Sequence, residues 1–152
     1  MAPQTIDQQD VCLGTKWGWY NFRMPRTRVG VIRGGPTSEY DFSLRTGTAM
    51  MQALPESEFD ISDIYIDKRG VWHHRGMPST PSRALAQIDV ALNAVHGGVG
   101  EDGTVQRMIQ RMGVPYVGSQ PLQSGIAFNK IRARELLTGA GILMPRAVSF
   151  SM

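Results

Sequence analysis

Cysteine, charge and long apolar runs are all scarce in this sequence. Cys12 is the single cysteine among 152 residues, which excludes an internal disulfide and argues against a cluster of thiolate metal ligands. No apolar run approaches the roughly 20 residues that cross a bilayer, and the N-terminus lacks the apolar segment of a signal peptide. We therefore expect a cytoplasmic protein without a membrane-spanning segment.

Charged residues make up 19% of the chain and apolar residues 41%, which is typical of one globular domain with a substantial core. The formal net charge is +3, a mild attraction for anions such as nucleotide phosphates. The nearest approach to a basic patch is residues 130–134 on a predicted helix, where the charges are as easily a solvated face. Since no basic patch is interleaved with aromatic residues, we expect no nucleic-acid partner.

Glycine is abundant, with 17 residues, and its most informative cluster lies in the segment 96–106, HGGVGEDGTVQ. This segment joins an apolar run at 90–95, which predicts a buried strand, to a predicted amphipathic helix. The apolar face of that helix holds Val105, Met108, Ile109 and Met112, and the opposite face holds Gln106, Arg107, Gln110 and Arg111. A glycine-rich turn between a strand and a helix lets a ligand approach the backbone and the free N–H groups of the helix.

Predicted strands and helices alternate along the chain. Strands are expected at 29–33, 61–66, 71–72, 90–95 and 114–117, and helices at 42–54, from about 104, at 121–128 and at 130–137. This alternation predicts an α/β fold, a three-layer, Rossmann-like arrangement with helices on both faces of a parallel sheet. Ligands bind beyond the carboxyl ends of strands in such sheets, which selects the loops at 34–41 and 96–103.

The regular pattern covers about residues 28–141. Residues 1–27 are polar and irregular, with a small aromatic cluster, and we expect them to form an N-terminal extension. Residues 142–152 are typical of a crossover between domains followed by a first strand, so we expect them to begin a further, truncated domain.

Glu39 and Ser43 follow the first predicted strand. The Glu39 carboxylate precedes a helix, where it either holds a substrate ammonium or complements the helix N-terminus, an effect worth under about 1 kcal/mol. The default interpretation of Ser43 is that it caps the same helix, either at the N-cap position or in the first turn.

His96, Glu101 and Lys130 are the later candidates. A lone histidine at the end of a buried strand, such as His96, is more often a hydrogen-bonded structural residue than a catalyst. Glu101 and Asp102 could form a metal pair; we favour capping for Asp102, leave Glu101 open and predict no metal site. Lys130 lies between two short helices, where it could reach a nucleotide phosphate or be a plain surface residue.

Other patterns predict no site. His73 and His74 lack cysteine or carboxylate partners at ligand spacing, and we interpret them as solvated. The methionines in the predicted helices are interpreted as core filler. The glycine loops match neither Gly-x-Gly-x-x-Gly nor the P-loop pattern, which disfavours a dinucleotide site and a P-loop site.

Several short motifs follow one another between about residue 28 and residue 150. They are VGVI at 29–32 with Gly34-Gly35, Ser38-Glu39, Ser43-Leu44 with Gly47, Ile66-Asp67 with Gly70–Trp72, Ala94–Gln106, Gly113–Ser119, Asn129-Lys130 and Gly141–Pro145. In this order and spacing they resemble the N-terminal region of D-alanine–D-alanine ligases of the ATP-grasp superfamily. The resemblance implies a pre-ATP-grasp N-terminal domain.

Such ligases join two D-alanines for peptidoglycan synthesis: ATP phosphorylates the carboxylate of the first D-alanine, and the amine of the second attacks the acyl phosphate. The resemblance implies that Glu39 holds the ammonium of the first D-alanine, that His96 is a polar positioning group nearby, and that Lys130 reaches the ATP phosphates. It makes Glu39, Ser43 and His96 the catalytic candidates, and Glu39, His96 and Glu101 the substrate-binding candidates.

ATP and Mg²⁺ are the implied cofactors, with the Mg²⁺ ligands expected in the part of a ligase that follows Phe150. Without that part we expect no ligase activity from this chain alone. Departures from the family pattern at 36–37, 40–42 and 128–129 leave the second substrate open between D-alanine, D-lactate and related compounds. A homodimer is one expected assembly. The alternative function is a non-catalytic module that binds an amino acid or nucleotide, or that docks onto a separately encoded ATP-grasp portion.

Overall fold

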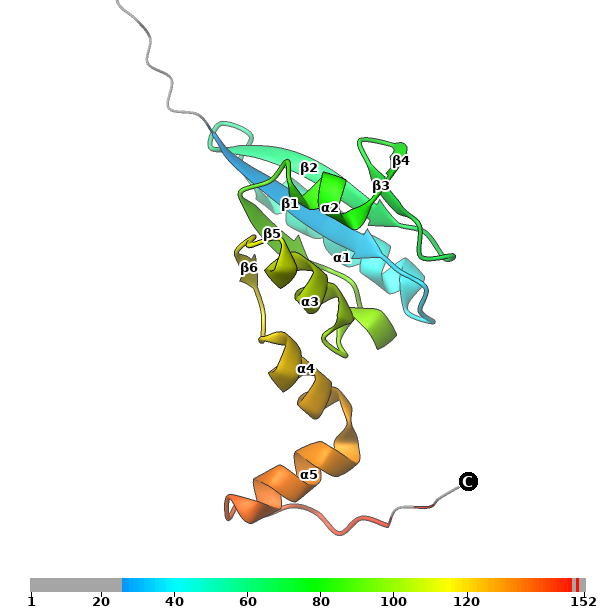
Figure 1. The fold of residues 1–152 in the computed structure, drawn as a ribbon, viewed down its shortest axis with the longest axis vertical. Helices are drawn as coiled ribbons and strands as arrows, with labels where there is room; N and C mark the ends of the chain where they lie inside the picture. The colour runs from blue at the N-terminus through cyan, green and yellow to red at the C-terminus, as the bar shows by residue number, and fades with distance from the viewer. Residues whose placement is uncertain (1–25, 149, 151–152) are drawn as a thin grey trace, which may run out of the picture.

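The computed structural model describes residues 26–148 and residue 150. The strands are β1 (Thr27–Gly34), β2 (Phe59–Ile66), β3 (Trp72–His74), β4 (Met77–Ser79), β5 (Val90–Asn93) and β6 (Tyr116–Val117). The helices are α1 (Tyr40–Ala53), α2 (Pro81–Leu85), α3 (Thr104–Arg111), α4 (Pro121–Phe128) and α5 (Lys130–Gly139), with a short 3₁₀ helix, η1 (Gly98–Gly100). Their order along the chain is visible in Figure 1.

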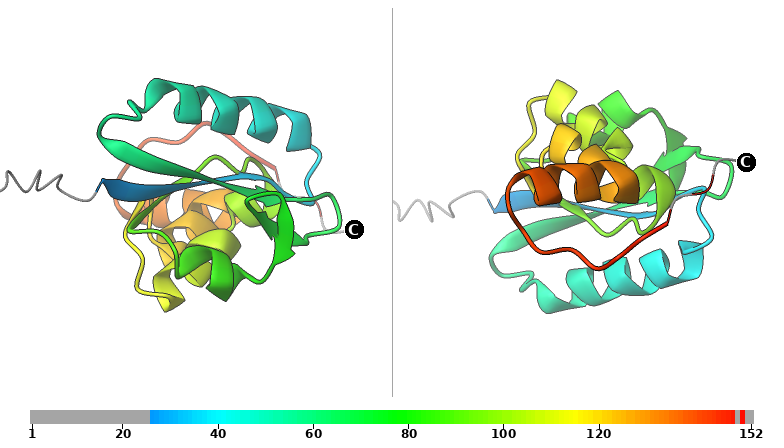
Figure 2. Two further views of the ribbon diagram at one scale, coloured as in Figure 1. Left: turned by 90° about the horizontal axis from the view of Figure 1, so that it is seen from above. Right: turned by 90° about the horizontal axis from the view of Figure 1, so that it is seen from below.

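The six strands form one sheet in the order β4-β3-β2-β1-β5-β6. β1 pairs in parallel with β2 and β5, and β5 pairs in parallel with β6. Helix α1 covers one face, while α2, α3 and α4 lie on the other (Figure 2). The predicted three-layer α/β fold is therefore confirmed, with a buried cluster on each face of the sheet.

The sheet is mixed rather than wholly parallel, because β3 pairs antiparallel with both of its neighbours, β2 and β4. Asp67 causes the first reversal: its Oδ1 accepts hydrogen bonds from the N–H groups of Arg69 (2.8 Å) and Val71 (2.9 Å). A side chain that satisfies two backbone donors makes a tight turn without a helix, so the chain returns beside β2. The sequence indicated a short strand at 71–72 but missed β4.

Helix α2 was also missed, since the sequence pattern predicted no helix between residues 72 and 90. Pro81 occupies the first turn of α2, where proline is favoured, and the Thr80 hydroxyl accepts a hydrogen bond from the N–H of Arg83 (3.3 Å). This short helix is buried through Ala84 and Leu85, both 0% exposed, so packing and not its own length stabilises it.

Three side chains are less solvated than their sequence pattern indicated. His74 is only 7% exposed, because it alternates with Trp72 toward the core. His73 packs against the Tyr65 ring, with 5.3 Å between the ring centroids. Gln106, assigned to the polar face of α3, is 6% exposed. Met112, in contrast, is 39% exposed and is not core filler.

The strand order makes the boundary between β1 and β5 the topological switch point of the sheet. From β1 the chain crosses through α1 to β2 on one side; it later returns through α2, on the opposite face, to β5 on the other side of β1. The loops that leave β1 and β5 therefore diverge toward opposite faces, which is the usual ligand position of such sheets. Both are the loops selected from the sequence. None of the described helices is long and apolar enough to cross a membrane.

Candidate functional site

Glu39, His96 and Glu101 converge where these two loops meet. Glu39 precedes α1, His96 follows β5, and Glu101 follows η1. Each offers one potential ligand atom, and these three atoms lie within 4.8 Å of one another. His96 Nδ1 lies 3.8 Å from Glu101 Oε1. The structure thus brings together two carboxylates and an imidazole from three separate segments.

The Glu39 side chain does not cap the helix that it precedes. It occupies the N-cap position of α1 but forms no capping hydrogen bond. Its carboxylate instead lies over Gly97, where an added β-carbon would stand 2.8 Å from Glu39 Oε1, and Gly97 has a φ of +66°. A side chain at position 97 would therefore be strained and would collide with Glu39. The carboxylate is left exposed beside His96.

Residues of the β1–α1 segment hold His96. The Thr37 hydroxyl donates a hydrogen bond to the His96 carbonyl (2.9 Å), and Thr46 Oγ1 lies 3.1 Å from His96 Nε2. The ring of Phe42 packs edge-on against the imidazole, with 4.7 Å between the ring centroids. The remaining ring nitrogen, Nδ1, faces Glu101. Sequence reasoning missed these contacts, although Phe42 and Thr46 share one helix face at i, i+4 spacing.

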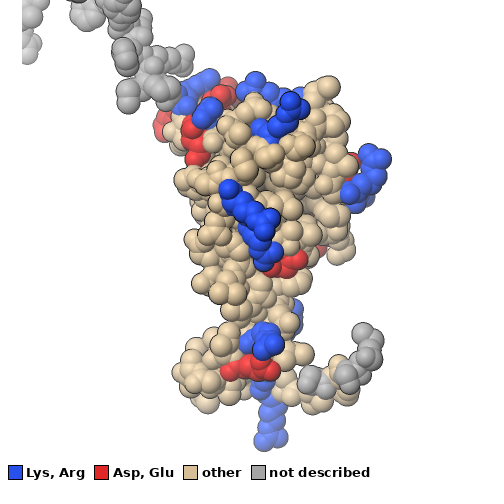
Figure 3. All heavy atoms as spheres, in the orientation of Figure 1, with Lys and Arg blue, Asp and Glu red and all other residues tan. Residues whose placement is uncertain are grey.

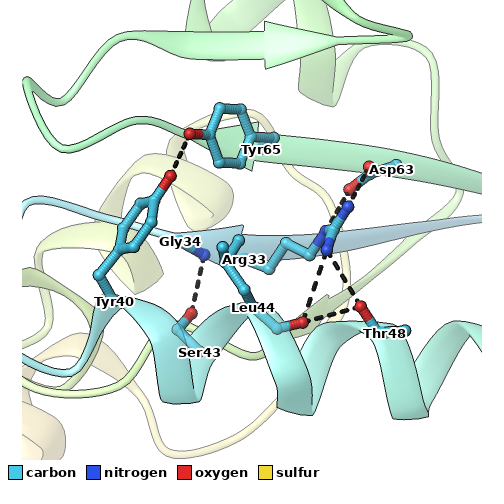
Figure 4. A network of polar contacts seen from close by, with 8 residues as sticks. All are labelled: Arg33, Gly34, Tyr40, Ser43, Leu44, Thr48, Asp63 and Tyr65. Atoms are coloured by element: carbon cyan, nitrogen blue, oxygen red, sulfur yellow. Dashed lines mark hydrogen bonds and ion pairs between the residues drawn. The ribbon is translucent and has the colours of Figure 1, made fainter.

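Ser43 ties the ends of β1 and β5 together. Its hydroxyl accepts a hydrogen bond from the Gly34 N–H (2.7 Å) and donates one to the Ala94 carbonyl (2.8 Å); the first is drawn in Figure 4. Ser43 lies inside α1 and is 0% exposed, so the capping interpretation is wrong. Because both bonds go to backbone groups, the hydroxyl is not directed at a ligand, and Ser43 positions the two strand ends.

Arg33 anchors α1 to the sheet on the same side (Figure 4). Its guanidinium donates two hydrogen bonds to the Asp63 carboxylate (2.7 and 2.6 Å) and one to the Thr48 hydroxyl (3.1 Å). The hydrogen bonds to Asp63 raise the pKa of Arg33 above its usual value. Near the start of α1, burial raises the pKa of Tyr40 to about 12, and its hydroxyl contacts that of Tyr65. The Arg33 contacts hold the middle of α1 against β2, and the Tyr40 contact holds its first turn, next to Glu39.

Lys130 is the first residue of α5 and lines a cavity that Glu101 also lines. This cavity has a volume of about 380 Å³, and its lining includes Gln106, Ser119, Ser124 and Phe128. Lys130 forms no ion pair with any residue that the structure describes. Its ammonium is therefore available to an anion next to the Glu39–His96–Glu101 cluster.

The cluster suits a cation. An ammonium group would donate charge-assisted hydrogen bonds to two carboxylates. A divalent metal that accepts nitrogen ligands would also match one imidazole and two carboxylates. Mg²⁺ prefers oxygen ligands, so it does not fit this set. Asp102 takes no part in the cluster: its Oδ1 accepts a hydrogen bond from the N–H of Thr104 (2.8 Å) at the start of α3. It therefore satisfies a helix N–H group as expected, although the N-cap residue is Gly103 and not Asp102.

Charge on the described surface is mixed. On the face shown in Figure 3, basic and acidic side chains are interspersed in a mostly uncharged surface.

Comparisons with known proteins point to one family. A family model described as D-ala D-ala ligase N-terminus matches residues 75–119, the segment with His96 and Glu101. The D-alanine–D-alanine ligase of Carboxydothermus hydrogenoformans is 37% identical over 124 residues, which cover 82% of this chain and 37% of that protein.

Solved structures show the same likeness. The VanG D-Ala:D-Ser ligase from Enterococcus faecalis matches with a TM-score of 0.73 and 28% identity, over 80% of this chain and 44% of that one. The D-alanine–D-alanine ligase from Bacillus anthracis complexed with ATP matches with a TM-score of 0.66 and 34% identity, over 80% of this chain and 37% of that one. The chain spans less than half the length of these relatives. In sequence and in fold, it corresponds to the N-terminal region of the D-alanine–D-alanine ligase family.

Proposed function

We propose that this chain supplies the part of a D-alanine–D-alanine ligase that binds the first D-alanine. The convergence of Glu39, His96 and Glu101 within 4.8 Å at the ends of two adjacent parallel strands carries the proposal. Two carboxylates at such close range repel one another unless a cation lies between them. The ammonium of an amino acid supplies that cation, and its hydrogen bonds to carboxylate oxygens are of the strong, charge-assisted kind.

Each residue has a distinct role in the proposed site. Glu39 accepts hydrogen bonds from the substrate ammonium, and Glu101 adds the second negative charge. His96, held by Thr37 and Thr46, presents Nδ1 toward the same space and orients the substrate as a polar group. A fixed ammonium orients the substrate carboxylate, and such orientation is a large part of the rate advantage in group transfer.

The proposed reaction is the ATP-dependent formation of D-alanyl-D-alanine for peptidoglycan synthesis in the cytoplasm. The carboxylate of the first D-alanine takes a phosphoryl group from ATP, and the amine of the second displaces phosphate as the peptide bond forms. Lys130 is the residue of this chain that meets the ATP phosphates, since its ammonium borders the cavity beside Glu101. The Mg²⁺ ligands belong to the portion of the ligases that this chain does not span. That portion is either continuous with the chain or a separately encoded ATP-grasp partner.

Titration of the purified chain with D-alanine tests the proposal. We expect saturable binding of D-alanine, weaker binding of L-alanine, and a loss of at least about tenfold in affinity on Glu39→Gln, because a charged hydrogen bond is worth about 1.5–3 kcal/mol. Glu58→Gln is the matched control, because Glu58 is exposed beside the opposite end of β2. Equal affinity of the wild type and Glu39→Gln would contradict the proposal. Binding of Ni²⁺ or Zn²⁺ without binding of D-alanine would favour a metal centre instead.

A further inference from the structure

The Asn93 side chain forms hydrogen bonds at both ends of the loop that carries His96 and Glu101. Asn93 is the last residue of β5. Its Oδ1 accepts a hydrogen bond from the N–H of Val95 (3.2 Å), and its Nδ2 donates one to the carbonyl of Gly100 (3.0 Å). Val95 directly precedes His96, and Gly100 directly precedes Glu101. The Asn93 carboxamide therefore bridges the two backbone positions from which the two site residues depart.

Gln106 binds the same carbonyl group, that of Gly100. From α3, its Nε2 donates a second hydrogen bond to the Gly100 carbonyl (2.6 Å). Gln106 is only 6% exposed although it is a polar residue. A carbonyl oxygen has two lone pairs, and here two carboxamides occupy both. The peptide group between Gly100 and Glu101 cannot rotate without the loss of both bonds.

The loop is also closed on itself at its base. An added β-carbon at Gly100 would stand 2.3 Å from the Val95 carbonyl oxygen, so these two residues touch through their backbones. The N–H groups of Glu101 and Asp102 both donate to the Gly98 carbonyl (3.0 and 2.9 Å). The loop is thus a tight, internally bonded turn, and the two carboxamides hold it to β5 and α3.

We propose that Asn93 and Gln106 are positioning residues that set the separation of His96 and Glu101, and with it the affinity of the site for an amino-acid ammonium. This inference rests on the function proposed above. Neither residue belongs to the cluster, so both act through the backbone of the loop. A displacement of about 1 Å in a charged site is enough to cost a large part of its function.

A double-mutant cycle in the full chain tests the inference. Asn93→Leu and Gln106→Met keep the side-chain size and remove the donors, and each is expected to weaken D-alanine binding about tenfold, the equivalent of one buried hydrogen bond. In a Glu101→Gln background the effect of Gln106→Met should largely disappear, because Gln106 acts through the Gly100 carbonyl next to Glu101. The effect of Asn93→Leu should shrink but persist in part, because Asn93 also holds the Val95 N–H next to His96. Val105→Ala, on the same helix, is the control: it opens a cavity at a 2% exposed residue and should lower stability without a tenfold loss of affinity.

A measurement without ligand separates this inference from the proposed function. In ¹⁵N-labelled chain, the heteronuclear NOE of the amides at 98–102 should fall in Asn93→Leu and Gln106→Met and stay at the wild-type value in Val105→Ala. If the wild type does not bind D-alanine but the two variants show this fall, the proposed function is overturned. The two carboxamides then remain the determinants of loop geometry. Unchanged NOE values in both variants, or effects fully additive with Glu101→Gln, would overturn the inference.

Discussion

Ser43→Ala should lower the free energy of unfolding more than any other removal of a single oxygen atom near the site. The substitution deletes both hydrogen bonds of the Ser43 hydroxyl and leaves the N–H of Gly34 and the carbonyl of Ala94 without that partner. A buried polar group left unpaired costs about 1–3 kcal/mol. Alanine is the better helix former by roughly 0.5 kcal/mol, which offsets part of this cost. The expected net loss is about 2–3 kcal/mol.

Urea denaturation followed by circular dichroism measures this loss as a lower midpoint with an unchanged m-value. Ser38→Ala is the matched control, because Ser38 is exposed in the loop between β1 and α1, and changes at exposed positions usually stay within about 0.5 kcal/mol. A loss below about 1 kcal/mol in Ser43→Ala would refute the argument that this hydroxyl joins the ends of β1 and β5. A weaker affinity for D-alanine should accompany the loss, since these two strand ends carry the loops of the site.

Three further outcomes are expected. Gly97→Ala should weaken D-alanine binding at least about tenfold, because position 97 has a φ of +66° and an added β-carbon would stand 2.8 Å from the Glu39 carboxylate; Gly139→Ala, with nothing near an added β-carbon, should leave it unchanged. Burial lowers the pKa of His74 below its usual value, so the unfolded chain takes up a proton first and stability should fall as the pH drops below about 6.5. His74→Phe should show a smaller loss between pH 7.5 and 5.5 in urea denaturation, and an identical loss in both proteins would contradict this cause. The purified chain alone should release no phosphate from ATP in a D-alanine-dependent manner, and turnover similar to that of a full-length ligase would refute this expectation.

Local sequence patterns were sufficient for most of the fold. The helices at 121–128 and 130–139 and the parallel strands β1, β2 and β5 follow from periodicity, proline and glycine positions and β-branched residues. The hairpin strand β4 and the short helix α2 were missed. Each is too short to show a period. β4 pairs with β3, a neighbouring strand that is itself only three residues long, and α2 is stabilised by the burial of Ala84 and Leu85 in the core.

Burial was harder to predict than secondary structure. His74 and Gln106 are polar residues with buried side chains, and a sequence pattern assigns such residues to solvent because burial of an unpaired polar group is costly. For Gln106 that cost is reduced by the bond to the Gly100 carbonyl, a partner that only the folded loop presents. The same limit applied to Ser43, whose acceptor at Ala94 lies 51 residues away in sequence.

The sequence by itself determined the layers of the fold and the two loops at the strand ends, because these depend on local periodicity and on the positions of glycine and proline. The resemblance to D-alanine–D-alanine ligases implied the binding candidates Glu39, His96 and Glu101. Only the tertiary structure decided that Glu39, His96 and Glu101 meet within 4.8 Å, that Ser43 joins two strands and that Asn93 and Gln106 share one carbonyl. The physical reason is that each of these contacts joins different segments of the chain, and its geometry exists only after β1 and β5 have paired side by side in the sheet.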